Sequence, residues 1–105
     1  MGTGGAALSQ QTRHILVVAG PAADPAQLRR TLQQRSARGP AEFTLLVPAG
    51  EEDADAPQRL VQLVELLRAS GLDVAGRLGA PDPAAAVAET WDPLEYDELV
   101  LEQPR

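Results

Sequence analysis

The turn behind the first apolar run of the chain is where ligand chemistry is most expected. Residues 14–19 form a short apolar run typical of a strand buried on both faces, and Gly20-Pro21-Ala22-Ala23-Asp24 follows it. In α/β folds the turn behind a central strand is a usual binding position. A dinucleotide would need Gly-x-Gly-x-x-Gly in this turn, which here has a single glycine, and a Walker A loop would need a lysine, which the chain lacks.

Residues that serve as nucleophiles, bases and metal ligands are scarce. The chain has no cysteine, which excludes disulfides, thiol catalysis and thiolate metal sites, and its one histidine, His14, excludes a histidine-based metal cluster. Ser36 and Ser70 stand at predicted helix ends, and no Gly-x-Ser-x-Gly motif is present. We therefore expect no enzyme activity and no metal centre.

An acidic loop, residues 49–55, leaves two interpretations open. Its carboxylates, Glu51, Glu52, Asp53 and Asp55, could bind a cation or a partner, or they could simply solvate a connector. Like charges without an aromatic or histidine partner favour the solvated connector.

The charge pattern argues against one class of partner and points to another. A net charge of −6 argues against nucleic-acid binding, which needs a basic face, and Phe43, Trp91 and Tyr96 are too few aromatic residues for base stacking. The predicted first helix is rich in arginine and has no acid, whereas the C-terminal quarter of the chain is strongly acidic. This asymmetry is consistent with electrostatic steering, with self-association between unlike faces, or with two ordinary solvated surfaces.

The elements that must position these residues alternate between strands and helices. Asp24-Pro25 and Asp82-Pro83 each combine a capping carboxylate with a proline at the first helical position. Apolar periodicity and turn signals predict strands at 14–19, 42–47, 72–78 and 98–101 and helices at 25–38, 57–70 and from 83 to the Asp92-Pro93 break. This alternation predicts a three-layer α/β/α, Rossmann-like fold with a four-stranded parallel sheet. The right-handed crossover rule gives the strand order 3-2-1-4.

Each helix has a face that its side-chain spacing predicts. The arginines of the first helix are expected on its solvent side: Arg29, Arg30, Arg35 and Arg38. The second helix is expected to bury an apolar stripe: Leu60, Val61, Leu63, Val64 and Leu67. The third is expected to bury a side made of Ala84, Val87, Ala88 and Trp91.

Residues 1–12 are expected to form a flexible leader and residues 13–105 a single domain. The leader lacks the basic and continuous apolar regions of a signal peptide, and no apolar stretch of the chain approaches bilayer length. We therefore expect a cytoplasmic protein without membrane contact.

Several segments together carry a family resemblance: 13–19, 37–49, 71–74, Asp82-Pro83, 89–93 and 96–101. They resemble short proteins related to the universal stress proteins, an actinobacterial-type group with an adenine-nucleotide α-hydrolase-like fold. The resemblance covers nearly the whole chain after the leader. Its most specific parts are the second predicted strand and Trp91-Asp92-Pro93.

The resemblance implies a parallel sheet in the order 3-2-1-4-5, and ATP binding in some members of the family. In the members that bind ATP, an aspartate follows the first strand and a glycine-rich run after the fourth strand holds the phosphates. Here Gly20-Pro21 stands where that aspartate is expected, and only Glu102-Gln103-Pro104-Arg105 follow the predicted fourth strand. We therefore expect a chain truncated after its fourth strand, without a phosphate-binding run.

The leading interpretation is a non-enzymatic, universal-stress-like regulatory or protein-interaction module that lacks the ATP phosphate-binding loop. The alternative is a degenerate adenine-nucleotide-binding protein in which Gly20, Pro21 and Val47 hold the adenosine of ATP or AMP. Without a further strand, the fourth strand is a bare edge and part of one sheet face is uncovered. We therefore expect a homo-oligomer formed through this edge, or cover by the chain's own leader, beside an unidentified protein partner.

Overall fold

Strands and helices alternate along the part of the chain that the structure describes, residues 12–20 and 23–102. In this computed structural model the elements are β1 (Arg13–Ala19), α2 (Pro25–Ser36), β2 (Ala41–Pro48), α3 (Ala56–Ala69), β3 (Asp73–Gly79), α4 (Pro83–Thr90) and β4 (Glu98–Glu102). The strands pair in parallel in the order β3-β2-β1-β4. The predicted three-layer α/β/α fold and its strand order are confirmed.

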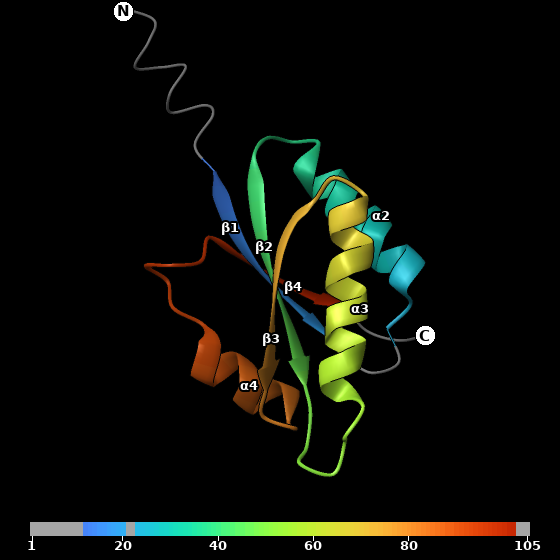
Figure 1. Cartoon of the computed structure of the whole chain (residues 1–105). Helices are drawn as coiled ribbons and strands as arrows, with labels where there is room; N and C mark the ends of the chain where they lie inside the picture. Colours follow the sequence, from blue (N-terminus) through green and yellow to red (C-terminus); the bar gives the residue numbers. More distant parts are fainter. Residues whose placement is uncertain (1–11, 21–22, 103–105) are drawn as a thin grey trace, which may run out of the picture.

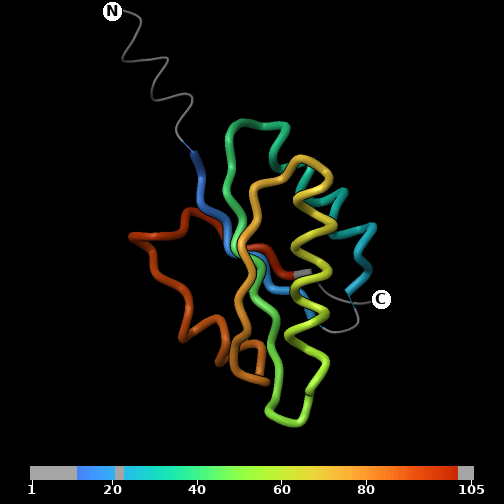
Figure 2. Tube along the Cα trace, in the orientation of Figure 1, coloured from blue at the N-terminus to red at the C-terminus, as the bar shows by residue number. Residues whose placement is uncertain are grey.

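The three layers follow from the path of the chain through the sheet. Figure 1 shows α2 and α3 on one face of the sheet and α4 on the other. The chain steps outward from β1 through β2 to β3 and then returns to the far side of β1 to form β4. Because crossovers between parallel strands are right-handed, a step outward and a step back place their helices on opposite faces. The Cα trace shows this return, with α4 and its connection to β4 running on the side away from α2 and α3 (Figure 2).

Two of the helices begin with a capping aspartate, as predicted. The Asp24 carboxylate accepts a hydrogen bond from the Ala26 N–H at 3.0 Å. The Asp82 carboxylate accepts one from the Ala85 N–H at 3.3 Å. Each bond satisfies an N–H group that has no partner within the first turn of a helix, so each start is fixed locally.

The C-terminal end of α2 comes earlier than predicted. The helix ends at Ser36 and not at Arg38. The N–H groups of Arg38 and Gly39 donate to the carbonyls of Arg35 and Ser36, in tight turns that do not continue the α-helix. Gly39 then takes a φ angle of +145°, which side chains rarely allow, and the chain turns into β2.

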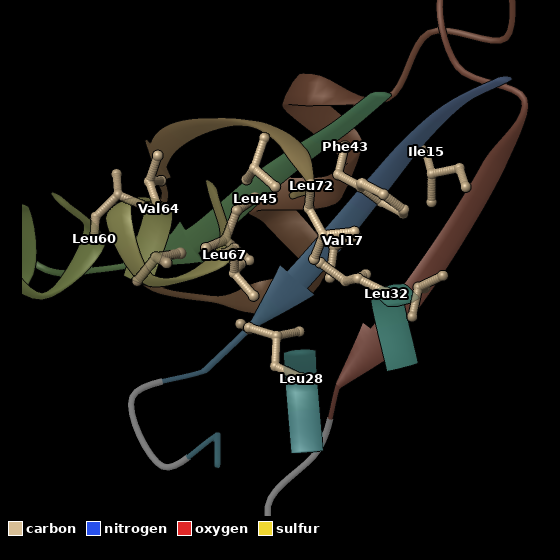
Figure 3. Close-up of a cluster of buried hydrophobic side chains, with 14 residues drawn as sticks. Ile15, Val17, Leu28, Leu32, Phe43, Leu45, Leu60, Val64, Leu67 and Leu72 are labelled. Atoms are coloured by element: carbon tan, nitrogen blue, oxygen red, sulfur yellow. The ribbon is translucent and has the colours of Figure 1, made fainter. Parts of the chain in front are cut away.

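The larger hydrophobic core lies between the sheet and the layer of α2 and α3 (Figure 3). β1 and β2 contribute to it from alternate positions, because successive side chains of a strand point to opposite faces. The side chains labelled in Figure 3 all belong to this core: Ile15, Val17, Leu28, Leu32, Phe43, Leu45, Leu60, Val64, Leu67 and Leu72. Each of them is at most 8% exposed, so this layer holds the two helices firmly on the central strands.

One member of the predicted α3 stripe lies outside this core. Val61 is 56% exposed, whereas Leu60 and Val64 on the same helix are each 8% exposed. Successive residues of a helix are roughly 100° apart, so a helix on a flat sheet buries a narrower stripe than the prediction assumed. The prediction that Val61 is buried is therefore wrong.

The core on the α4 face is smaller. It consists of Leu16, Val18, Leu46, Ala86 and Tyr96. α4 can approach the sheet closely because Gly79, at the end of β3, has no side chain. A Cβ added at Gly79 would lie 2.9 Å from the Ala86 Cβ, well inside normal contact.

The predicted buried side of α4 is only partly right. Val87 and Trp91 are partly buried against the smaller core, but Ala84 and Ala88 are exposed. Ala86, which was not predicted, is fully buried. Ala86 packs where Gly79 leaves room for α4 to approach the sheet. The spacing of the alanines in α4 could not indicate which of them would be buried there.

No helix within residues 12–20 and 23–102 has both the length and the apolar character to span a bilayer. Of the predicted leader, only Thr12 belongs to the described residues. The flexibility of the leader therefore stays a prediction.

Candidate functional site

Gly20 lies at the C-terminal end of β1, where the order of the strands reverses and α/β folds commonly bind ligands. Its carbonyl accepts a hydrogen bond from the Ala23 N–H at 3.1 Å, which closes the turn before α2. A Cβ added at Gly20 would meet no atom within 4 Å, and its φ angle is not in the left-handed region. Neither packing nor backbone conformation therefore requires a glycine here. Pro21, the next residue predicted for nucleotide binding, lies outside the described residues.

Val47, the third residue predicted for adenosine, lies near the C-terminal end of β2, next to β1. Its side chain is 2% exposed and belongs to the core beneath α2 and α3. Gly20 and Val47 thus lie at the ends of neighbouring strands, but the Val47 side chain is committed to packing. Adenosine binding at this position stays a prediction. Such binding would have to involve backbone groups of Val47, because its side chain is buried in the core.

The acidic loop is held by an ion pair between Asp53 and Arg59. The Arg59 guanidinium donates two hydrogen bonds to the carboxylate, with Nη1···Oδ1 at 3.1 Å and Nη2···Oδ2 at 2.6 Å. These hydrogen bonds hold the pKa of Asp53 below its usual value. Within the described ranges, no group of three or more His, Cys, Asp and Glu side chains is placed to hold a metal ion. Arg59 of α3 therefore balances one carboxylate of the loop, and both interpretations of the loop stay predictions.

His14 stands at the opposite end of β1 from Gly20. Its Nδ1 is 3.4 Å from Glu42 Oε2, and both side chains are about half exposed. Its backbone exchanges two hydrogen bonds with Asp97: the His14 N–H donates to the carboxylate at 2.8 Å, and the Asp97 N–H donates to the His14 carbonyl at 2.7 Å. Ligands of α/β sheets bind beyond the C-terminal ends of the strands, so His14 is placed to align β1 with β4 and not to act in such a crevice.

An exposed apolar surface lies along β4 on the α4 face. Leu99 pairs in register with Leu16, and Leu101 with Val18, so all of these side chains point to the same face of the sheet. Leu16 and Val18 are buried, but Leu99 is 38% exposed and Leu101 is 54% exposed. α4 packs mainly on β2 and β3, and therefore leaves these two leucines uncovered.

The connection from α4 to β4 covers β1 and stops short of β4. Trp91 and Tyr96 stack with their ring centroids 5.8 Å apart and their planes at 22°. Tyr96 is 7% exposed and packs with Leu16 and Val18 of β1. No further strand among residues 12–20 and 23–102 pairs with the outer edge of β4. The β4 surface, defined here as Leu99, Leu101 and this outer edge, is the candidate interaction site.

The opposite face of β4 is fixed by charged side chains. The Glu98 carboxylate forms ion pairs with Arg35 of α2 and, at 3.7 Å, with Arg13 of β1. Arg13 also donates from Nη2 to the Arg35 carbonyl at 2.7 Å. The prediction that Arg35 shares the solvent side of α2 is therefore wrong. No signal in the sequence indicates the Arg35 contact; the register, which pairs Glu98 with Ile15 two residues after Arg13, accounts only for the contact with Arg13.

Comparison with known proteins supplies no further assignment for this surface. No protein-family model matches the chain, and no curated protein matches it. The universal-stress-like family therefore stays a prediction that rests on the segments given above, and function has to be argued from the geometry of β4.

Proposed function

We propose that this chain is a non-enzymatic, universal-stress-like regulatory or protein-interaction module of the cytoplasm, which self-associates through β4 and does not hold ATP by its phosphates. The observation that carries the proposal is the β4 surface, where Leu99 and Leu101 are exposed beside an edge that no described strand covers. Apolar side chains next to unpaired backbone N–H and C=O groups favour the addition of another chain.

A second copy is the simplest occupant, because a strand edge can pair with itself about a two-fold axis. An antiparallel pairing centred on Val100 sets Leu99 of one copy opposite Leu101 of the other and buries both leucine pairs on the α4 face. Each copy carries a net charge of −6, so two copies repel one another. We therefore expect this association to strengthen as added salt screens the repulsion.

Sedimentation at micromolar concentration in about 0.15 M salt, where the Debye length is ~8 Å, tests the proposal. We expect the unmodified chain to be a dimer and Leu101→Arg to be a monomer. Val61→Arg is the matched control, because Val61 on α3 is 56% exposed and Leu101 is 54% exposed. A monomeric unmodified chain, or a Leu101→Arg variant that dimerises as tightly as the control, would overturn the proposal.

Titration with ATP, ADP and AMP separates this function from adenine-nucleotide binding, the second candidate, which is supported by the position of Gly20 at the reversal of strand order. We expect no saturable binding of any of the three. Saturable binding with amide shifts confined to Gly20, Ala23 and Asp24 would favour the second candidate. Equal affinity for ATP and AMP would then show that the β- and γ-phosphates are not held.

A further inference from the structure

Leu94 is 96% exposed, the highest value among the large apolar side chains of the described residues. It lies in the connection between α4 and β4, residues 91–97, which runs on the side of the sheet away from α2 and α3 (Figure 1). The Asp92 carboxylate accepts the Leu94 N–H at 2.9 Å, and the Asp92 carbonyl accepts the N–H groups of Glu95 and Tyr96 at 2.9 and 2.8 Å. A hydrogen-bonded turn therefore presents Leu94 to solvent. Burial of the Leu94 side chain against another surface would remove apolar area from water, which the fold of a single copy does not do.

A hollow of suitable size lies between α2 and α3, and we call it the α2–α3 hollow. It has a volume of about 220 Å³ and is lined by Pro25 of α2 and by Arg59, Gln62, Leu63 and Leu66 of α3. Leu66 is 38% exposed, so the hollow offers apolar surface to solvent. An apolar cavity of about 150 Å³ already holds a benzene molecule. The α2–α3 hollow can therefore hold the side chain of a leucine.

The charges around the two features are complementary. Segment 89–97 has four carboxylates and no basic residue, whereas α2 has no acid and carries Arg29 and Arg30 besides Arg35, which pairs with Glu98. One of those arginines, Arg29, lies one turn after Pro25. The Asp53 carboxylate beside the hollow is already paired with Arg59. The acidic segment around Leu94 is therefore complementary in charge to the α2 side of the hollow.

We propose that Leu94 of one copy inserts into the α2–α3 hollow of a second copy, with Asp92 and Glu95 facing Arg29 of α2. The two surfaces lie on opposite sides of the sheet, so two copies cannot exchange them reciprocally. Such a heterologous contact extends head to tail. It uses neither Leu99 nor Leu101, and so it is independent of the pairing proposed for β4.

The contact is small, so it is tested near 1 mM protein, a concentration that suits a weak single-side-chain interface. The measurement uses Leu101→Arg as the background, which removes the β4 pairing. In about 0.01 M salt the weight-average sedimentation coefficient should rise with concentration. It should fall when salt is raised to about 0.15 M, since the Debye length shortens from ~30 to ~8 Å. This salt response is opposite in sign to that expected for β4.

Two exposed positions provide the deciding variants. Leu94→Ser removes the inserted side chain, and Leu66→Asp disrupts the hollow; each should weaken the association about tenfold or more. Val61→Ser, on the side of α3 away from the hollow, should leave it unchanged.

Mixing the variants tests the head-to-tail geometry directly. Leu94→Ser keeps an intact hollow and Leu66→Asp keeps an intact Leu94, so an equimolar mixture should form one contact and stop at a 1:1 pair. Each variant alone should associate about tenfold or more weakly than the background. A Leu94→Ser variant that associates like the background, or a mixture that behaves as the sum of its components, would overturn the proposal.

Discussion

Replacement of Gly79 by alanine should loosen α4 from the sheet. A Cβ at this position would lie 2.8 Å from Leu46 Cδ1 and 2.9 Å from the Ala86 Cβ. Carbon atoms in ordinary contact are about 3.5–4.0 Å apart. The Leu46 side chain can rotate, but the Ala86 Cβ is fixed to the helix backbone. α4 must therefore move away from β3 by roughly 1 Å.

The magnitude follows from two opposing effects. Overpacking of this kind costs about 1–3 kcal/mol, and we expect the lower part of that range because α4 has one fully buried residue, Ala86, and can shift. Gly79 has no left-handed φ angle, so alanine is compatible with its backbone. The substitution also lowers the conformational entropy of the unfolded chain, which raises the free energy of unfolding by about 0.4–1 kcal/mol. The net expectation is a loss of about 1 kcal/mol in the free energy of unfolding. For a domain of this size that corresponds to a decrease in Tm of about 4–8 °C.

Urea unfolding with two probes measures this effect. Trp91, the only tryptophan of the chain, packs against the core that contains Ala86 and reports on α4 by its fluorescence, while far-UV circular dichroism reports on the whole fold. Gly20→Ala is the control, because its Cβ would meet no atom within 4 Å, and it should be neutral or slightly stabilising. If Gly79→Ala proves as stable as Gly20→Ala, with unchanged Trp91 emission, the close approach of α4 is not as described.

Three further contacts at the edges of the fold can be tested by substitution. Asp97→Ala should lower the free energy of unfolding by about 0.5–1 kcal/mol, because it removes the acceptor of the His14 N–H. Asp97→Asn keeps an acceptor and should lose less. Equal free energies of unfolding for the two variants, measured by chemical denaturation, would contradict this reason. Glu98→Gln should cost no more than about 1 kcal/mol, and less at high salt, since its ion pairs are partly exposed; a salt-independent loss would point to packing. Asp53 has a lowered pKa in the folded state, so its pair with Arg59 stabilises the fold above the usual aspartate pKa and this contribution is lost as pH falls through the lowered value. Arg59→Gln should return the Asp53 pKa, measured by carboxyl NMR titration, towards the usual value, and an unchanged titration would refute the assigned cause.

Much of this fold could be predicted because its signals are local. Asp24-Pro25 and Asp82-Pro83 mark helix starts through the chemistry of two adjacent residues, and both caps form as expected. The buried strands appear as unbroken apolar runs. The strand order depends on the handedness of crossovers and not on any particular side chain, which is why it too could be derived without coordinates.

Side-chain placement at the periphery could not be predicted in this way. The spacing of Arg35 indicates solvent, but its side chain reaches Glu98 because β4 lies beneath that end of α2. Ala86 is buried and Ala88 is exposed because Gly79 admits α4 in one orientation. The exposure of Leu94 likewise depends on the whole path from α4 to β4. Each of these outcomes is set by neighbours distant in sequence, whereas periodicity reports only on the element itself.

The pairing of β1 with β4 has a consequence for the order of folding. The hydrogen bond between His14 and Asp97 joins residues 83 positions apart, while the larger core is built mainly from β1, β2, β3, α2 and α3. Contacts between residues far apart in the sequence form late, so we expect α4 and β4 to dock after β1, α2, β2, α3 and β3 have folded. We also expect α4 and β4 to be the first elements to detach under native conditions. Each detachment would uncover Leu16 and Val18 together with one side of the central strand. β4 therefore protects the edge of β1 from pairing with another chain. Local opening of β4 would allow the β4 of a second copy to take its place, which is a route to domain swapping.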